Sequence, residues 1–154
     1  RLTQPSKVIE LEAEKAKGRT YGRVVDVHWR WRLQAAESIA TNIDPLRFGV
    51  VGFYIFGSVS NANAGPESDI DLLIHFRGTE AQRQDLLTWL DGWNSCLSAE
   101  NHQRTGYKIS ALLDVHLITD DDIQKRTSFA IKIGALSDAA RPLAIGTGKK
   151  KNGS

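Results

Sequence analysis

The sequence predicts a small mixed β-sheet flanked by helices, an architecture of the α/β (α+β) class. Three short apolar runs, at 49–56, 69–76 and about 109–118, are rich in β-branched and aromatic residues and have the length of buried strands. Helical periodicity precedes the first run and follows the second. Because amphipathic helices bury their apolar faces, we expect them to cover at least one face of the sheet.

The chain before the first strand is predicted to be helical in two parts. Residues 7–17 form a charged helix candidate that ends at Gly18, a residue suited to the position after a helix. A longer amphipathic helix follows, with apolar residues at spacings of three and four. These residues are Val24, Val27, Trp31, Ala35, Ile39 and Ile43. Asp44-Pro45 ends this helix, because a residue before proline disfavours the α region.

Turn and helix signals separate the later strands. Residues 59–68 are turn-forming types and predict a loop. The helix after the second strand has apolar residues at helical spacing, namely Leu86, Leu90, Trp93 and Leu97. After the third strand Thr119 is a candidate N-cap, and we attribute Asp120, Asp121 and Asp122 to helix capping rather than to calcium binding. No element is predicted beyond about residue 134.

Composition limits the class of protein and its compartment. The 154 residues are 41% hydrophobic and 25% charged, as in one globular domain. No run reaches the roughly 18 apolar residues of a spanning helix, so we expect no membrane association. Cys96 is the single cysteine and cannot form an internal disulfide, so we expect a cytoplasmic protein. We predict an N-terminal helical extension at 1–22, the main domain at 23–145 and a disordered basic tail at 146–154. Since no methionine stands at position 1, we expect a longer polypeptide.

The charge of the predicted domain does not favour nucleic-acid binding. The formal net charge is +2, from 20 lysines and arginines against 18 acidic residues. Lys149, Lys150 and Lys151 lie in the tail, and without these three basic residues the net charge is −1. A body so balanced lacks the basic surface that nucleic acid requires.

Two carboxylates stand at the start of the second strand. Side chains of a strand alternate between faces, so Asp69 and Asp71 project from one side while Ile70 and Leu72 project from the other. Two carboxylates this close repel each other unless a cation lies between them, and oxygen ligands suit Mg²⁺ or Mn²⁺. The alternative is that one or both aspartates cap turns or pair with arginines.

Gly57-Ser58 ends the first strand, and an acidic residue interrupts the third. The glycine allows a sharp turn and close approach of a ligand, and successive amides with a serine hydroxyl can hold phosphate oxygens. Alone, this pair also fits a plain turn. Asp114 lies inside an apolar strand, where an ionised carboxylate is costly unless it is paired or metal-bound. His116 shares its face and is interpreted as a supporting polar residue rather than a ligand.

Together these segments resemble the DNA polymerase β-like nucleotidyltransferase superfamily, and within it the small bacterial minimal nucleotidyltransferase domains. The residues that carry the resemblance are Gly57-Ser58, Ser68-Asp69-Ile70-Asp71-Leu72 and Asp114. The motif match covers 53–76, and the third aspartate with the order of elements extends it over about 24–130.

The resemblance implies a polymerase β palm-like fold and a reaction. A nucleoside monophosphate passes from an NTP, with ATP as the expected donor, to an acceptor hydroxyl, and pyrophosphate is released. The implied nucleotide contacts are Gly57, Ser58 and Ser68. Asp69 and Asp71 would hold two Mg²⁺ (or Mn²⁺) ions, and Asp114 would complete the metal site and help to activate the acceptor.

The sequence also departs from the pattern of this superfamily. Many relatives carry an arginine and a further glycine where Asn61 and Ala62 stand, and no basic residue lies between Ser58 and Asp69. Phosphate contacts must therefore come from amides, hydroxyls, metals or another segment. The alternative functions are a non-catalytic nucleotide-binding regulatory module of a larger protein, or one half of a two-component, toxin–antitoxin-like pair with a helical partner subunit or fused domain. The acceptor is left open.

Other residues with chemical potential are interpreted as structural. The tryptophans are Trp29, Trp31, Trp89 and Trp93. Trp31 and Trp93 lie on the apolar stripes and are expected in the core rather than stacked on a base. Arg30 and Arg32 are expected on a solvated helix face, and Cys96 in packing beside Leu97. The histidines have no zinc-like spacing; they are His28, His75, His102 and His116.

Overall fold

The computed structural model describes residues 22–127, 129–133 and 139–147. The predicted helix at 7–17 lies outside these residues, as do nearly all of the predicted N-terminal extension and most of the predicted basic tail. Within the described residues, no helix is long and apolar enough to cross a bilayer.

The sheet is mixed, as the sequence predicts, and has the order β3-β2-β1-β4. Strand β1 (Val50–Phe56) pairs antiparallel with β2 (Ile70–Phe76), and β2 pairs parallel with β3 (Leu113–Ile118). The short strand β4 (Arg141–Pro142) adds antiparallel to the other edge of β1. The second predicted strand is therefore central, with the first and third on either side.

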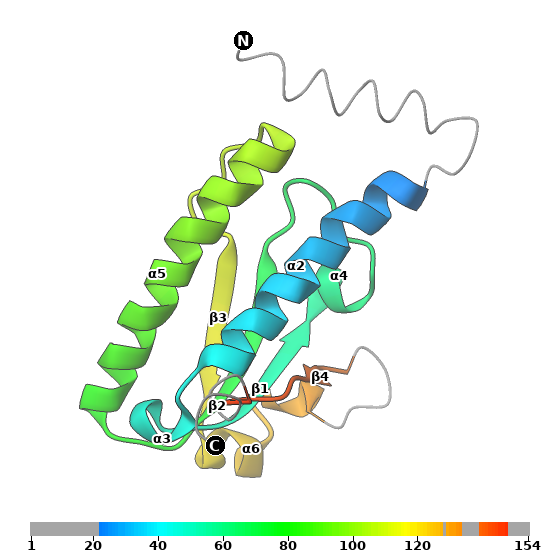
Figure 1. Cartoon of the computed structure of the whole chain (residues 1–154). Helices are drawn as coiled ribbons and strands as arrows, with labels where there is room; N and C mark the ends of the chain where they lie inside the picture. The colour runs from blue at the N-terminus through cyan, green and yellow to red at the C-terminus, as the bar shows by residue number, and fades with distance from the viewer. Residues whose placement is uncertain (1–21, 128, 134–138, 148–154) are drawn as a thin grey trace.

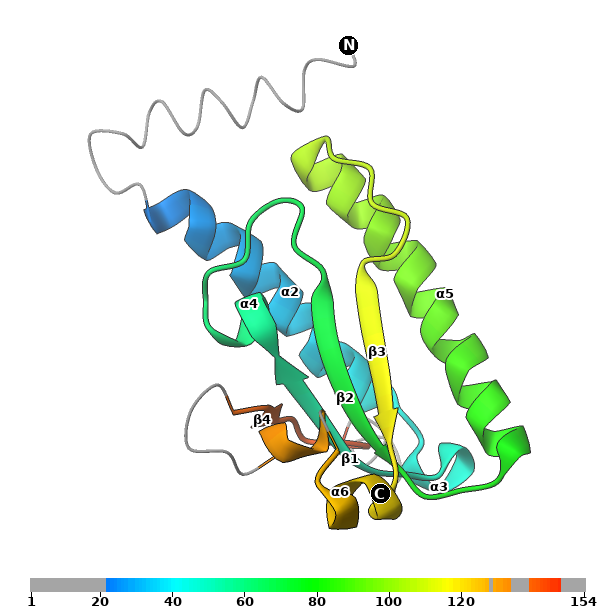
Figure 2. The same cartoon turned by 180° about the vertical axis from the view of Figure 1, so that it is seen from behind.

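Two long helices cover one face of this sheet. Helix α2 (Gly22–Asn42) and helix α5 (Glu80–Thr105) lie together in front of the strands in Figure 1, and the strands lie in front of them in Figure 2. Alternate residues of β2, including Ile70 and Leu72, pack in the same core cluster as residues of both helices. The period-two pattern of β2 thus leaves Asp71 on the opposite face.

Local signals in the sequence account for most of the helix ends. Thr79 begins α5 with a capping box, and Gly106, at φ 81°, ends it. Thr119 begins α6 (Asp120–Lys125) with a second capping box, so its predicted N-cap role is confirmed. Helix α2 ends at Asn42, just before the stop predicted at Asp44-Pro45. Asp44 also caps a short further helix, α3 (Pro45–Phe48).

Short elements are where the sequence-based boundaries were wrong. The segment predicted as a loop at 59–68 begins inside a one-turn helix, α4 (Gly57–Ser60), and β3 begins at Leu113 rather than near residue 109. The 3₁₀ helix η1 (Ala130–Lys132) and strand β4 were not predicted. Elements this short depend on pairing with distant residues, so they leave little periodic signal in the sequence.

The second face of the sheet is covered only in part. A small cluster of buried residues forms there, where η1 and the start of β4 approach the sheet. It consists of Phe56, Leu73, Ile118, Ala130 and Ala140. Asp71 and Asp114, which face the same side, lie at the beginning of their strands.

Candidate active site

The three predicted carboxylates meet at one end of the sheet. The parallel register pairs Asp71 of β2 with Asp114 of β3, and Asp69 stands immediately before β2. One ligand oxygen from each of the three carboxylates lies within 4.8 Å of the others. The structure therefore brings together residues that are far apart in the sequence, because β3 adds parallel beside β2.

Asp114 is more exposed than its apolar surroundings in the sequence suggest. Its side chain is 48% exposed, so the prediction of a carboxylate in a buried strand was wrong. The reason is topological, since β3 is an edge strand of the sheet. Asp69 and Asp71 are half-buried, so the cluster has a partly buried side and an open side.

The electrostatics of the cluster favour a bound proton or a bound cation among the carboxylates. Partial burial, together with the charges of Asp69 and Asp114 and a hydrogen bond with Asp114, raises the pKa of Asp71 to about 7, although Lys132 opposes the shift. Carboxylates held this close share a proton unless positive charge is supplied. A set of three carboxylates also has the hard oxygen donors that Mg²⁺ and Mn²⁺ prefer, so these residues fit such an ion.

Gly57, the first residue of α4, lies close to the carboxylate of Asp71. Its φ is 75°, in the left-handed region, and a Cβ built on it would overlap the Oδ2 atom of Asp71. The register explains this contact, because Phe56, the residue before it, pairs with Asp71. Any other residue would be strained here, and the half-buried Ser58 follows directly. Backbone amides of a turn thus begin beside the carboxylates, as the sequence predicted.

Ser68, the third predicted nucleotide contact, is engaged in a turn. Its Oγ accepts a hydrogen bond from the amide of Gly65 at 2.9 Å, and its own amide donates to the carbonyl of Gly65 at 3.2 Å. These bonds close the turn that leads into Asp69. A contact between Ser68 and a nucleotide stays a prediction.

Three further residues, from β3 and from the segment at η1, lie near the carboxylates. Nε2 of His116 lies 3.2 Å from Oδ2 of Asp114, and the ring stacks on Phe129 at a centroid distance of 4.0 Å. His116 thus supports Asp114, as predicted. Lys132 lies with its Nζ 5.4 Å from the centre of the Phe56 ring and acts electrostatically on Asp71. No pattern in the sequence points to this lysine, which supplies positive charge that the loop before Asp69 lacks.

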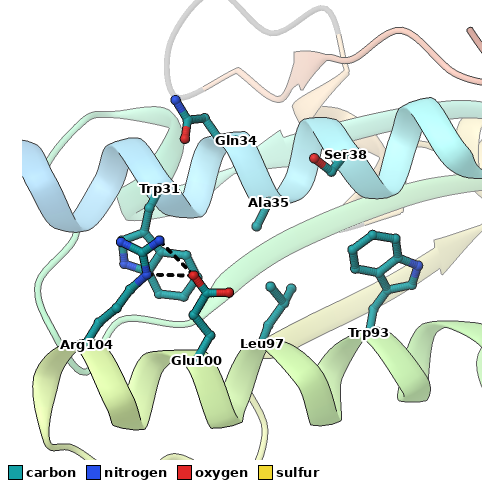
Figure 3. A pocket seen from close by; sticks show the side chains of 8 residues that line it. All are labelled: Trp31, Gln34, Ala35, Ser38, Trp93, Leu97, Glu100 and Arg104. Carbon is teal, nitrogen blue, oxygen red and sulfur yellow. Dashed lines mark hydrogen bonds and ion pairs between the residues drawn. The ribbon is translucent and has the colours of Figure 1, made fainter. Parts of the chain in front are cut away.

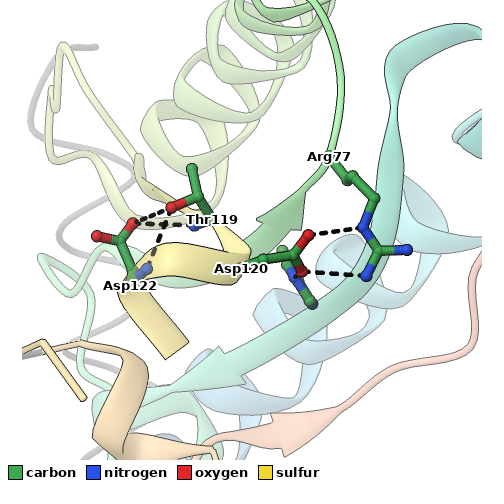
Figure 4. A network of polar contacts seen from close by, with 5 residues as sticks. Arg77, Thr119, Asp120 and Asp122 are labelled. Carbon is green, nitrogen blue, oxygen red and sulfur yellow. Dashed lines mark hydrogen bonds and ion pairs between the residues drawn. The ribbon is translucent and has the colours of Figure 1, made fainter. Parts of the chain in front are cut away.

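Two structural interpretations from the sequence were wrong, and the capping interpretation of residues 120–122 was confirmed but incomplete. Arg32, expected on a solvated helix face, is fully buried at 0% exposure. Cys96, expected in packing, is exposed, because neighbouring residues of a helix point in different directions and only Leu97 faces the core. Asp120 belongs to a capping region but also pairs with the guanidinium of Arg77 at 2.8 Å and with His75 at 2.7 Å (Figure 4).

A cavity of about 240 Å³ lies between α2 and α5, away from the carboxylates (Figure 3). Its lining residues are Trp31, Gln34, Ala35, Ser38, Trp93, Leu97, Glu100 and Arg104. Trp31 is buried and Trp93 packs on the core, so the predicted structural role of both is confirmed. Because these helices cover the face opposite Asp71, the cavity is separate from the candidate active site.

Residues 38–136 match the family model of the nucleotidyltransferase domain, and this segment contains all three carboxylates. The chain belongs to the nucleotidyltransferase domain family. Membership confirms both the resemblance to the DNA polymerase β-like superfamily and the predicted enzyme class, and it implies a nucleotide substrate.

Other comparisons add little to the family assignment. A crystal structure from Sulfolobus solfataricus, of a protein described as a nucleotidyltransferase, is 16% identical, with a TM-score of 0.39 over 71% of this chain and 84% of that one. Similarity at this level carries no argument about function. No curated protein matches the chain.

The nucleotidyltransferase domain should lose stability as pH rises from about 4 to 7. A folded-state pKa of about 7 for Asp71 means that the folded protein holds a proton that the unfolded chain releases near pH 4. Asp71→Asn removes this loss of stability, because asparagine does not ionise. A full shift corresponds to about 4 kcal/mol, and solvent screening at a half-buried site reduces it to about 1–2 kcal/mol.

We therefore expect Asp71→Asn, without metal, to melt about 2–6 °C above the wild type at pH 8, and the two proteins to melt together at pH 4. Thermal denaturation in chelator at both pH values measures the difference. A wild type as stable as the variant at pH 8 would show that the carboxylates do not repel one another in the folded protein.

Proposed function

We propose that this chain is a metal-dependent nucleotidyltransferase that moves a nucleoside monophosphate from an NTP, with ATP as the donor, to an acceptor hydroxyl. The observation that carries the proposal is the convergence of Asp69, Asp71 and Asp114 beside the turn at Gly57. The three carboxylates would hold Mg²⁺ or Mn²⁺, which when bound neutralises phosphate charge and positions the reacting oxygens.

The chain's own residues have separate tasks in this proposal. The amides that follow Gly57 and the hydroxyl of Ser58 bind phosphate oxygens, and Ser68 is proposed to contact the nucleotide from the turn that it closes. The acceptor oxygen attacks the α-phosphorus as the bond to the oxygen of the β-phosphate breaks, so pyrophosphate leaves. Asp114 takes the proton of the acceptor hydroxyl, since its half-exposed carboxylate lies on the open side of the cluster.

The proposal extends to the organisation of the protein. We assign the catalytic domain to residues 23–145, which enclose the family match at 38–136, with an extension at 1–22 and a basic tail at 146–154. The exposed thiol of Cys96 suits a reducing cytoplasm. A helical partner subunit or fused domain would supply the acceptor side.

Thermal denaturation tests nucleotide and metal binding together. Mg²⁺ with a non-hydrolysable ATP analogue should raise the melting temperature, because a ligand at 100-fold excess over its Kd stabilises the folded state by about 2.7 kcal/mol. The increase should vanish in the double variant Asp69→Asn/Asp71→Asn. It should persist in Asp85→Asn/Asp91→Asn, which changes charge equally at two exposed positions of α5.

The same samples can also contradict the proposed nucleotide binding. If the wild type shows no shift, and calorimetry at millimolar analogue and Mg²⁺ detects no heat of binding, the chain does not bind the proposed donor. A shift that survives in the Asp69→Asn/Asp71→Asn variant would place the nucleotide elsewhere.

A further inference from the structure

We propose that Arg32 is a positioning residue of the active site, whose buried guanidinium fixes the turn that carries Asp69. This inference rests on the proposed function, in which Asp69 is a metal ligand. Arg32 belongs to α2, on the covered face of the sheet, and the hydrogen bonds described for it go to backbone carbonyls and to Asn101 rather than to the three carboxylates. It acts through the backbone of the turn before Asp69.

The guanidinium donates to two of the three carbonyl groups that precede Asp69. Nε of Arg32 donates to the carbonyl of Ser68 at 2.9 Å, and Nη2 donates to the carbonyl of Pro66 at 3.1 Å. The first of these carbonyls belongs to the peptide bond that joins Ser68 to Asp69. Any movement of this peptide group moves the Cα atom of the proposed ligand.

The guanidinium is itself held by both long helices. Nη1 donates to the carbonyl of His28, one turn earlier in α2, at 3.2 Å, and Nη2 donates to Oδ1 of Asn101 in α5 at 2.7 Å. Asn101 is also fully buried and donates from Nδ2 to the carbonyl of Pro66 at 3.2 Å. Arg32 and Asn101 therefore tie α2, α5 and the turn into one unit.

The turn before Asp69 is anchored on both of its sides. Gly65 and Ser68 close it with two hydrogen bonds, and after Asp69 the amide of Ile70 donates to the carbonyl of Leu112 at 2.7 Å. The β-ladder thus fixes the residue after Asp69, and Arg32 fixes the residue before it. With both attachments in place, the backbone of Asp69 has little freedom.

The chemistry of the contact explains why the residue is an arginine. All four hydrogen bonds described for Arg32 go to neutral oxygens, so they do not by themselves require a charge. Burial and the charge of Arg104 lower the pKa of Arg32 to about 10, while the charge of Asp69 opposes this shift, so Arg32 stays a buried cation at neutral pH. A lysine would keep the charge but not the planar set of donors that serves several carbonyl groups at once.

The expected effect is on metal affinity and on the order of the turn. Residues that orient a metal ligand typically change metal affinity 10- to 100-fold when replaced. We expect Arg32→Lys to weaken Mn²⁺ binding about 10-fold and Arg32→Gln about 100-fold. The amide hydrogens of Ser68 and Ile70 should exchange faster in both variants without metal, and the partial rescue by lysine would separate the contribution of charge from that of the donor geometry.

The experiment measures Mn²⁺ affinity by electron paramagnetic resonance and amide exchange by NMR on the same proteins. Arg30→Gln is the matched control, because Arg30 is exposed on the same helix, and it should behave as the wild type in both measurements. Asn101→Ala removes the α5 anchor and leaves Arg32 in place. It should show a smaller loss of the same kind, and it replaces Arg32→Gln if that variant does not fold.

The outcomes distinguish this inference from the proposed function. If the wild type binds Mn²⁺ and Arg32→Lys and Asn101→Ala bind it equally tightly, with unchanged exchange at Ser68 and Ile70, the positioning role is overturned and the proposed metal site stands. If the wild type does not bind Mn²⁺, the proposed function is overturned. Faster exchange in the Arg32 variants would then uphold only the anchoring of the turn.

Discussion

Asp69→Asn and Asp71→Asn should each reduce nucleotidyl transfer on the order of 10³-fold. Metal ions at a phosphoryl centre contribute several kcal/mol of charge stabilisation, and each 1.36 kcal/mol corresponds to about tenfold in rate. An amide in place of one carboxylate removes a charge from a cluster whose ligand oxygens lie within 4.8 Å of one another. The measurement is transfer of label from α-labelled NTP to an acceptor in a cell extract, per amount of folded protein.

The loss of transfer should not be a loss of folding. Asparagine has nearly the shape of aspartate, and at Asp71 it relieves the repulsion that raises the pKa of this carboxyl. The double variant should be no worse than either single variant by more than a small factor, because residues that act as a unit are not additive. Activity within a few-fold of the wild type in Asp69→Asn or Asp71→Asn would contradict the proposed metal site.

Asp114→Asn should reduce transfer about 10²-fold or more while nucleotide binding persists, the scale expected when help from a general base is removed. Asp69 and Asp71 still hold metal, and the turn at Gly57 still binds phosphate. Because Asp114 is 48% exposed and its partner His116 is also partly exposed, the stability cost should stay below about 1 kcal/mol. If this carboxylate had a structural role, Asp114→Asn would instead lower the stability of the protein and leave turnover intact.

This variant separates an enzyme from a nucleotide-sensing module. Melting temperature, affinity for the ATP analogue and turnover are measured on the same preparation of Asp114→Asn. A catalytic role requires retained stability and binding with transfer lost. Unchanged turnover in the folded fraction would exclude Asp114 as the proton acceptor and favour a module that uses only the phosphate and metal half of the site.

The core of the candidate site was predictable because it follows from local patterns. The alternation of Asp69, Ile70 and Asp71 fixes their faces, and an apolar run around Asp114 indicates a strand that belongs in the same sheet. The sequence cannot show that β3 lies at the edge. The exposure of Asp114 was therefore mispredicted, although its position beside Asp71 was not.

Residues that act through distant contacts were missed. Arg32 is a charged residue between Trp31 and Leu33, and its partners at Pro66 and Ser68 are carbonyl groups, which no side-chain pattern reveals. The sequence held a weak indication of this burial, because His28, Arg32 and Ala36 stand four residues apart and therefore share one face of the helix. In the structure all three are buried. Lys132 acts on Asp71 from a 3₁₀ helix whose Ala130 packs in the cluster on the second face of the sheet, and such a long-range contact leaves no local pattern.

The most direct test of the central claim is to supply α-labelled and γ-labelled ATP in parallel, with Mg²⁺ and a cell extract that provides acceptors. Transfer of a nucleoside monophosphate predicts that the α-label becomes attached to an acceptor and that the γ-label is released in pyrophosphate. Neither should occur with Asp69→Asn/Asp71→Asn or in excess chelator, and Asp85→Asn/Asp91→Asn should match the wild type. Attachment of the γ-label above the level of the extract alone, or no attachment of the α-label, would contradict the account.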